Sequence, residues 1–191
     1  MKTFIFLLFS FLFGSANATV INFDDITTSS QQAISANYAG MNWGSSWYVE
    51  SSSTSGNGSV SGDYAAFNGF GQLTMNLSNG LDFDFTGAYF TSWGSNGTFQ
   101  SYSATSITVE GYNNNALVGS VSMNLSAGQY DWFQTDLLAV DEVRFISSSS
   151  SQWWLMDDLT INESTSVPEP TTLALLVLGL ASVGFSRKKS S

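Results

Sequence analysis

Apolar and polar residues alternate with a period of two along much of the middle of the chain. The alternation is clearest at 81–85, where Leu81, Phe83 and Phe85 share one face and the two intervening aspartates share the other. Four further segments alternate in the same way: Ile107 with Val109; Val121 with Met123 and Leu125; Val143 with Phe145; and Leu155 with Leu159 and Ile161. The pattern predicts β-strands that bury one face.

Further strands are predicted where apolar and aromatic residues cluster between polar turns, at 20–23, 47–50, 64–68, 72–77, 88–93 and 131–135. Turn signals such as Asn79-Gly80 and Ala127-Gly128 separate the segments. About ten strands at this spacing predict an all-β fold, a two-sheet β-sandwich of jelly-roll type. The Ser-rich segments 51–58 and 147–151 are predicted to be exposed loops.

The first 18 residues follow the three-part order of a signal peptide. Met1-Lys2-Thr3 is basic, residues 4–13 are apolar, and the small residues that follow end in Ala16-Asn17-Ala18. An anchoring helix is the alternative, but ten apolar residues are about half of the roughly 20 that a membrane-spanning helix needs. We therefore predict a signal helix that is cleaved after Ala18.

The last 25 residues have a second three-part order. Val167-Pro168-Glu169-Pro170 precedes an apolar stretch at 173–185, and the basic cluster Arg187-Lys188-Lys189 follows it. Such a cluster resists translocation, so we expect a short hydrophobic transmembrane helix whose basic end stays in the cytoplasm. A plain single-pass anchor would have the same apolar and basic parts.

This tail resembles the PEP-CTERM sorting signal of Gram-negative bacteria. The resemblance implies that the tail is recognised in the inner membrane and that an exosortase cuts it near the Pro-Glu-Pro motif. It further implies that the mature protein reaches the outer surface or the exopolysaccharide matrix. The expected organisation is a signal peptide at 1–18, one β-sandwich domain at 19–166 and a sorting tail at 167–191.

The predicted domain is strongly acidic. Fourteen of the 15 Asp and Glu residues lie between residues 19 and 166, where Arg144 is the only basic residue, so the net charge is near −13. This charge repels phosphate backbones and argues against a nucleic-acid partner. The chain has no Cys and no His, which excludes Ser-His-Asp and Cys-His catalysis and His-ligated metals. Carboxylate chemistry and oxygen-ligated metals remain.

Two acidic doublets are candidate metal ligands: Asp24-Asp25 after the first predicted strand and Asp157-Asp158 inside the last. First and last strands of a jelly roll often lie close together, so the doublets can converge. If Leu155 and Leu159 face the core, period two places Asp157 in the core as well. A buried carboxylate needs a cation or several donors, and oxygen ligands favour Ca²⁺. The alternative is that these carboxylates cap turns or accept backbone hydrogen bonds.

The segments around the doublets, 22–26 and 156–161, resemble the opening and closing strands of galactose-binding-like and carbohydrate-binding jelly rolls. In those families, acidic residues near the chain ends often hold a structural calcium ion. The resemblance thus implies a structural Ca²⁺ and a glycan-binding type of sandwich.

Aromatic residues are the candidate ligand-binding groups, because indole and phenol rings stack on the apolar faces of sugars. The candidates are Trp43, Trp47, Tyr48, Tyr89, Trp93, Tyr102, Trp132, Trp153 and Trp154. About two-thirds of them are expected to be structural, since Trp and Tyr also fill sandwich cores. Trp43, Trp47 and Trp93 lie beside Gly- and Ser-rich turns and are predicted to be exposed.

Three functions fit these patterns. The first is a non-enzymatic surface or matrix protein whose sandwich binds extracellular polysaccharide, and the second is an inert structural or adhesive domain. The third is a secreted hydrolase with two carboxylates about 5 Å or roughly 6.5–9.5 Å apart. Its candidate carboxylates are Glu50, Glu110, Asp131 and Glu142. The first is the function that we predict.

Overall fold

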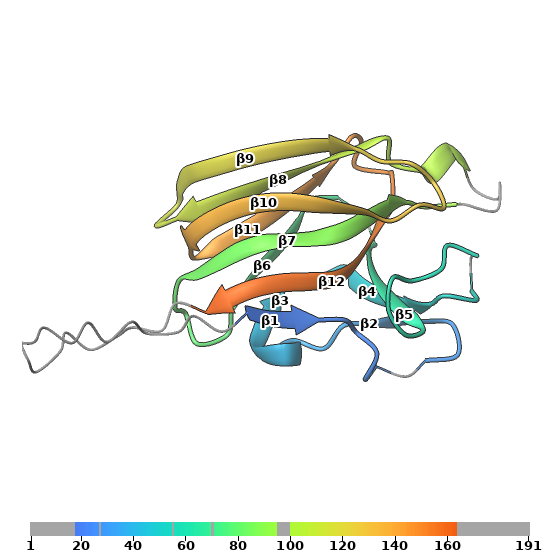
Figure 1. The fold of residues 1–191 in the computed structure, drawn as a ribbon, viewed down its shortest axis with the longest axis horizontal. Helices are drawn as coiled ribbons and strands as arrows, with labels where there is room; N and C mark the ends of the chain where they lie inside the picture. Colours follow the sequence, from blue (N-terminus) through green and yellow to red (C-terminus); the bar gives the residue numbers. More distant parts are fainter. Residues whose placement is uncertain (1–17, 27, 55, 70, 95–99, 164–191) are drawn as a thin grey trace, which may run out of the picture. The chain divides into compact units, whose positions relative to one another are not determined.

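A computed structural model describes residues 18–26, 28–54, 56–69, 71–94 and 100–163 of the 191-residue chain. These residues belong to one compact unit (Figure 1). Apart from Ala18, the predicted signal peptide lies outside the described residues, as do the sorting tail and its predicted helix. Within the described ranges, no helix is long and apolar enough to cross a membrane.

The described residues form two antiparallel sheets, which confirms the predicted all-β sandwich. Sheet A has the strand order β10-β7-β12-β5-β4-β2, with β1 paired to β12. Its strands are β1 (Ala18–Ile21), β2 (Gln31–Ala33), β4 (Trp47–Ser51), β5 (Tyr64–Asn68), β7 (Phe83–Ser92), β10 (Asp131–Val140) and β12 (Trp154–Glu163). The chain passes repeatedly between the sheets, as in a jelly roll.

Sheet B has the order β3-β6-β11-β8-β9. Its strands are β3 (Met41–Trp43), β6 (Leu73–Leu77), β8 (Ser106–Asn113), β9 (Ala116–Asn124) and β11 (Glu142–Ser147), and two short 3₁₀ helices are described at Tyr38–Gly40 and Gln100–Tyr102. Both sheets contribute alternate apolar side chains to the space between them. The core is therefore the stack of inward-facing residues that period two predicts.

Aromatic rings dominate the centre of this core. The ring centroid of Trp47 lies 5.2 Å from that of Phe145 and 5.6 Å from that of Trp154, both edge to face. Phe90 contacts Trp154 at 5.6 Å in the same manner. These four side chains are almost fully buried. Phe145 of sheet B thus packs against an aromatic group of sheet A at the centre of the sandwich.

A second apolar cluster covers part of the other face of sheet A. Ala65, Phe67, Trp93 and Leu155 form it, and Tyr48, Tyr130 and Trp153 pack against it. Its strand residues alternate with residues of the main core, such as Ala66 and Met156, so they point away from sheet B. Sheet A is consequently buried on both faces over β5 and the start of β12.

Some predicted strand boundaries are wrong. The segments 81–85 and 88–93 are one long strand, β7, in which Thr86 and Gly87 interrupt the alternation between the core residues Phe85 and Ala88. Leu81 precedes this strand and is 47% exposed, so it does not share the core face with Phe83. The short strands β2 and β3 have no predicted counterpart.

Candidate functional site

The three tryptophans predicted to be exposed are buried. Trp43, Trp47 and Trp93 are 4%, 1% and 3% exposed, respectively. Indole Nε1 of Trp43 donates to the Tyr38 carbonyl, and that of Trp47 donates to the Thr74 carbonyl, each at 2.9 Å. Strands β3 and β4 turn both rings into the core on either side of the Gly44–Ser46 turn. The prediction that these rings are exposed is therefore wrong.

Trp93 is buried for a different reason. It belongs to the second apolar cluster, where its ring centroid lies 5.1 Å from those of Phe67 and Trp153. Neither this ring nor those of Trp43 and Trp47 offers a face on which a sugar could stack. A glycan-binding surface must use other aromatic residues.

Trp132 is one aromatic residue that does reach the surface. It lies on β10 beside the core residue Phe133, with 38% of its surface exposed. Its ring packs edge to face against Tyr89 of β7, with centroids 5.2 Å apart. A Cβ at Gly87 would lie 2.9 Å from Cζ2 of Trp132, so the absence of a side chain at position 87 allows the indole to pack against the sheet there. The result is a partly exposed, fixed aromatic platform.

A row of polar side chains continues from this platform along the same face. Nε1 of Trp132 donates to Oε1 of Gln134 at 2.8 Å, and Nε2 of Gln134 donates to Asp136. On β7, Oδ1 of Asp84 accepts a hydrogen bond from the Ala139 amide at 2.8 Å. We call this surface the open strip; it comprises Asp84, Thr86, Tyr89, Trp132, Gln134 and Asp136.

Tyr102 is a second partly exposed aromatic residue. It is 41% exposed and stacks on Trp153, with centroids 5.2 Å apart and planes 18° from parallel. Because the Trp153 ring also packs on the buried Trp93, this stack borders the second apolar cluster. Tyr102 ends the short 3₁₀ helix Gln100–Tyr102, whereas Trp132 is held by two paired strands.

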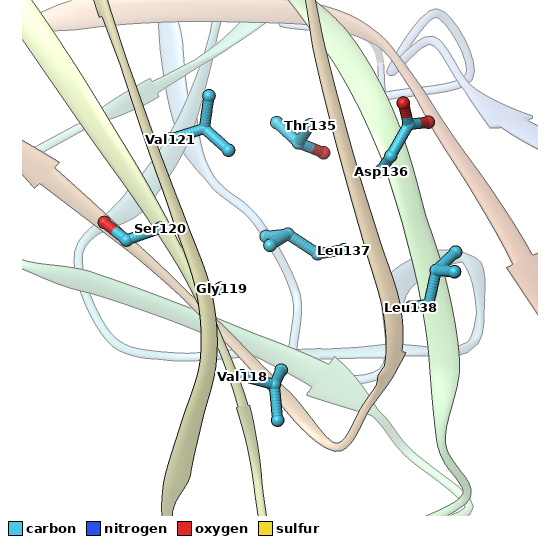
Figure 2. A pocket seen from close by; sticks show the side chains of 8 residues that line it. All are labelled: Val118, Gly119, Ser120, Val121, Thr135, Asp136, Leu137 and Leu138. Carbon is cyan, nitrogen blue, oxygen red and sulfur yellow. The ribbon is translucent and has the colours of Figure 1, made fainter.

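A groove of about 390 Å³ lies between the edge strands β9 and β10. Figure 2 shows Leu137 pointing across it toward Gly119, while Leu138 points away. A Cβ at Gly119 would lie 2.7 Å from Cδ2 of Leu137, so the glycine lets this leucine close the edge of the sandwich. The groove is lined without any aromatic side chain. It lacks the stacking surface that the open strip has.

Asp157 does not face the core, although it is fully buried. The strand β12 has an irregular register between Asp157 and Thr160, and Asp158 has a positive φ of 46°. This bulge puts Leu155 and Asp157 on the outer face of sheet A, and Leu159 on the core face. The prediction that Leu155 and Leu159 share a face is therefore wrong. The loop before β5 buries Asp157 instead.

That loop supplies the hydrogen-bond donors for the buried carboxylate. Oδ2 of Asp157 accepts from the amides of Val60 and Ser61 at 2.7 and 3.1 Å, and Oδ1 accepts from the Asp158 amide at 2.8 Å. Burial raises the pKa of Asp157 to about 7, against these three amide donors, which lower it. The carboxylate fastens the loop to sheet A.

The two acidic doublets converge on the same loop. Asp24 accepts from the Asp63 amide at 2.9 Å, and a Cβ at Gly62 would overlap its carboxylate. Asp158 accepts from the Ser61 hydroxyl at 2.7 Å, whereas Asp25 turns away to accept from the Tyr38 hydroxyl at 2.5 Å. These contacts are those of the alternative in which the carboxylates cap turns and accept backbone hydrogen bonds.

The hydrogen bonds that the four carboxylates accept come from N–H and O–H groups of the protein. Among the residues that the structure describes, no group of three or more His, Cys, Asp or Glu side chains could hold a metal ion.

Chelation tests this interpretation. We expect EGTA at about 5 mM to leave the melting temperature of the exported protein unchanged, because backbone N–H donors already bond to Asp157. Differential scanning fluorimetry with added CaCl₂ is the control. A rise in melting temperature with calcium that EGTA reverses would show that the carboxylates hold an ion.

The four candidate hydrolytic carboxylates lie in three places, with Glu110 and Glu142 on neighbouring strands of sheet B. Glu50 is 1% exposed and accepts from Asn57 at 3.0 Å beneath the loop before β5. Glu110 and Glu142 lie on sheet B, where Tyr112 donates to the first and Arg144 pairs with the second. Asp131 accepts from Gln129 at 2.7 Å. None of these contacts aligns two of the carboxylates across a cleft.

Comparisons with known proteins identify the tail. Residues 166–188 match the model of the PEP-CTERM protein-sorting motif, as the sequence predicts. A search of curated proteins finds no match. The sorting motif covers only the end of the chain, so the sandwich must be compared by its structure.

Several solved structures share the sandwich. A crystal structure of a DUF4465 family protein from Bacteroides caccae is 14% identical, with 78% of this chain and 100% of that chain covered and a TM-score of 0.56. The CBM22-1 xylan-binding domain of Paenibacillus barcinonensis Xyn10C is 12% identical, with 80% and 98% covered and a TM-score of 0.49. The K1 cleaved adhesin domain of Lys-gingipain from Porphyromonas gingivalis is 14% identical, with 78% and 99% covered and a TM-score of 0.44.

The first of these similarities supports the β-sandwich fold. The sorting motif marks a secreted protein that an exosortase processes. The chain therefore has a two-sheet β-sandwich domain and, at residues 166–188, a PEP-CTERM sorting motif, which marks it as a secreted protein that an exosortase processes.

Proposed function

We propose that the β-sandwich is a non-enzymatic glycan-binding domain, and that the open strip is its binding surface. The observation that carries the proposal is the Trp132–Tyr89 platform, which is fixed on two paired strands and partly exposed. An exposed, immobile indole offers a large apolar face at little cost in side-chain entropy. The polar side chains that follow it can hydrogen-bond the hydroxyl groups of a sugar chain.

The sorting motif supports a place for this activity. Exosortase processing would release the domain outside the inner membrane of a Gram-negative cell, at the outer surface or in the exopolysaccharide matrix. A domain that binds polysaccharide there would hold matrix and cell surface together.

Replacing Trp132 by alanine tests the site. We expect the variant to lose at least about tenfold in affinity for any polysaccharide that the exported protein binds, because Trp residues at the centre of a binding surface contribute most to affinity. Affinity electrophoresis in gels that contain soluble polysaccharides gives the comparison.

Tyr102→Ala is the matched control, because Tyr102 has a similar exposed fraction but lies outside the open strip. It should bind as the unmodified protein does. Loss of binding in the Tyr102 variant, with full binding in the Trp132 variant, would place the site at the Tyr102–Trp153 stack instead. Absence of binding to every polysaccharide tested would favour an inert structural domain.

A further inference from the structure

Along the open strip, hydrogen-bond donors are paired with acceptors of the protein, and the row of contacts ends at a carboxylate. The Trp132 indole donates to Gln134, and Gln134 in turn donates to Asp136. Asn162, at the margin of the strip, donates to Oγ1 of Thr86 at 3.5 Å. The donor groups in these contacts are directed at protein acceptors, whereas the row ends on carboxylates. A carboxylate has about four acceptor sites and, when ionised, no donor.

Asp84 and Asp136 supply the two carboxylates of the open strip. Oδ1 of Asp84 accepts from the Ala139 amide, and Oδ1 of Asp136 accepts from Gln134. Each carboxylate thus has further acceptor sites, and Asp84 is partly exposed while Asp136 is exposed. Arg144, the only basic residue between 19 and 166, lies on β11 of sheet B and pairs with Glu142 there.

Resting on the proposed function, we infer that the open strip selects non-anionic glycans, whose hydroxyl groups donate to Asp84 and Asp136, and excludes glycans that carry uronate or sulfate groups. A sugar hydroxyl is a donor and meets the acceptors directly. A sugar carboxylate or sulfate is an acceptor with a negative charge, so it meets two like charges on a domain whose net charge is near −13.

Pairs of polysaccharides that differ only in charge provide the test. We would compare β-1,4-glucan, β-1,3-glucan and β-1,4-galactan oligomers with the same oligomers after oxidation of the primary hydroxyls to carboxylates. For at least one pair we expect the neutral form to bind and the oxidised form to bind at least about tenfold more weakly at low ionic strength. The difference should shrink with added salt, which screens exposed charges.

A charge-removing variant sharpens the test. The double substitution Asp84→Asn and Asp136→Asn removes both charges and keeps the Oδ1 acceptor of each residue, while an NH₂ donor replaces the second oxygen. Asparagine tolerates the positive φ of 47° at position 136. We expect this variant to bind the neutral and oxidised forms with affinities that differ by less than about threefold. The control Glu110→Gln with Glu142→Gln removes two charges from sheet B and should leave the difference unchanged.

The possible outcomes separate this inference from the proposed function. Equal binding of both forms, or tighter binding of the oxidised form, overturns the selection of non-anionic glycans and leaves glycan binding in place. A preference that persists in the Asp84 and Asp136 variant, or that disappears in the sheet B control, also overturns it. Failure of every neutral and oxidised oligomer to bind overturns the proposed function and this inference with it.

Discussion

Replacing Trp47 by alanine is expected to lower the free energy of unfolding by about 3–5 kcal/mol. The side chain is 1% exposed, and its ring packs edge to face against Trp43, Phe145 and Trp154. Truncation leaves a cavity between the sheets and also removes the donor to the Thr74 carbonyl. Urea denaturation followed by circular dichroism measures the change.

Trp132→Ala is the comparison for this prediction. Its indole is partly exposed and its hydrogen bond is to another surface side chain, so its removal should change the free energy of unfolding by less than about 1 kcal/mol. Equal stability of the Trp47 variant and the unmodified protein would contradict the buried position of Trp47. It would also restore Trp47 as a candidate for ligand binding.

Asp157→Asn is expected to remove a pH dependence of stability. The pKa of Asp157 is raised from 3.8 to about 7 in the folded protein, so between these values the folded state binds a proton that the unfolded state does not. The stabilisation from this group is therefore complete below about pH 4 and is lost as the pH rises through about 7. Between pH 5 and pH 8 the free energy of unfolding of the unmodified protein should therefore fall by about 2–3 kcal/mol, and that of the variant should not show this fall.

The charged groups around Asp157 define the controls. Asp158 is adjacent, and Tyr130, whose pKa is raised by burial and by the charges of Asp157 and Glu50, stays neutral between pH 5 and pH 8. Asp158→Asn makes the same change one residue away and should keep the pH dependence. Urea denaturation at the two pH values gives the comparison. Parallel loss of stability in the Asp157 variant and the unmodified protein would contradict the raised pKa.

Much of the fold could be predicted because the period of two along a strand indicates which side chains are buried. Phe83 and Phe85, or Val143 and Phe145, face the core as their spacing predicts. The Asn79-Gly80 turn is also present, with φ of 71° at Gly80 and a hydrogen bond from the Gly80 amide to the Leu77 carbonyl. Local sequence specifies these features, so they needed no knowledge of tertiary contacts.

The burial of particular aromatic residues could not be predicted in this way. Trp43 and Trp47 flank a polar turn, yet the three-residue strand β3 pairs with β6 and directs Trp43 inward. Asp157 is buried by a loop that is 96 residues away in the chain, and the bulge at Asp158 shifts the alternation. These outcomes depend on contacts between segments far apart in the chain, and local alternation carries no information about such contacts.

Trp132, by contrast, has a local signal that identifies it. Phe133 and Leu137 are buried core residues of β10, and Trp132 and Gln134 alternate with Phe133. An aromatic residue out of phase with the apolar face of its strand is expected on the surface. Applying the period within 131–140 would have ranked Trp132 above the tryptophans beside turns.

The indole N–H signals of the exported protein test the central claim most directly. The chain has six tryptophans, and substitution of Trp132 by phenylalanine assigns its signal in a ¹H–¹⁵N correlation spectrum. Titration with the neutral oligosaccharide that binds most tightly should shift the Trp132 signal most, and leave those of the buried Trp43 and Trp47 nearly unchanged. A saturable shift confined to other indoles, with the Trp132 signal unmoved, would contradict a glycan site on the open strip.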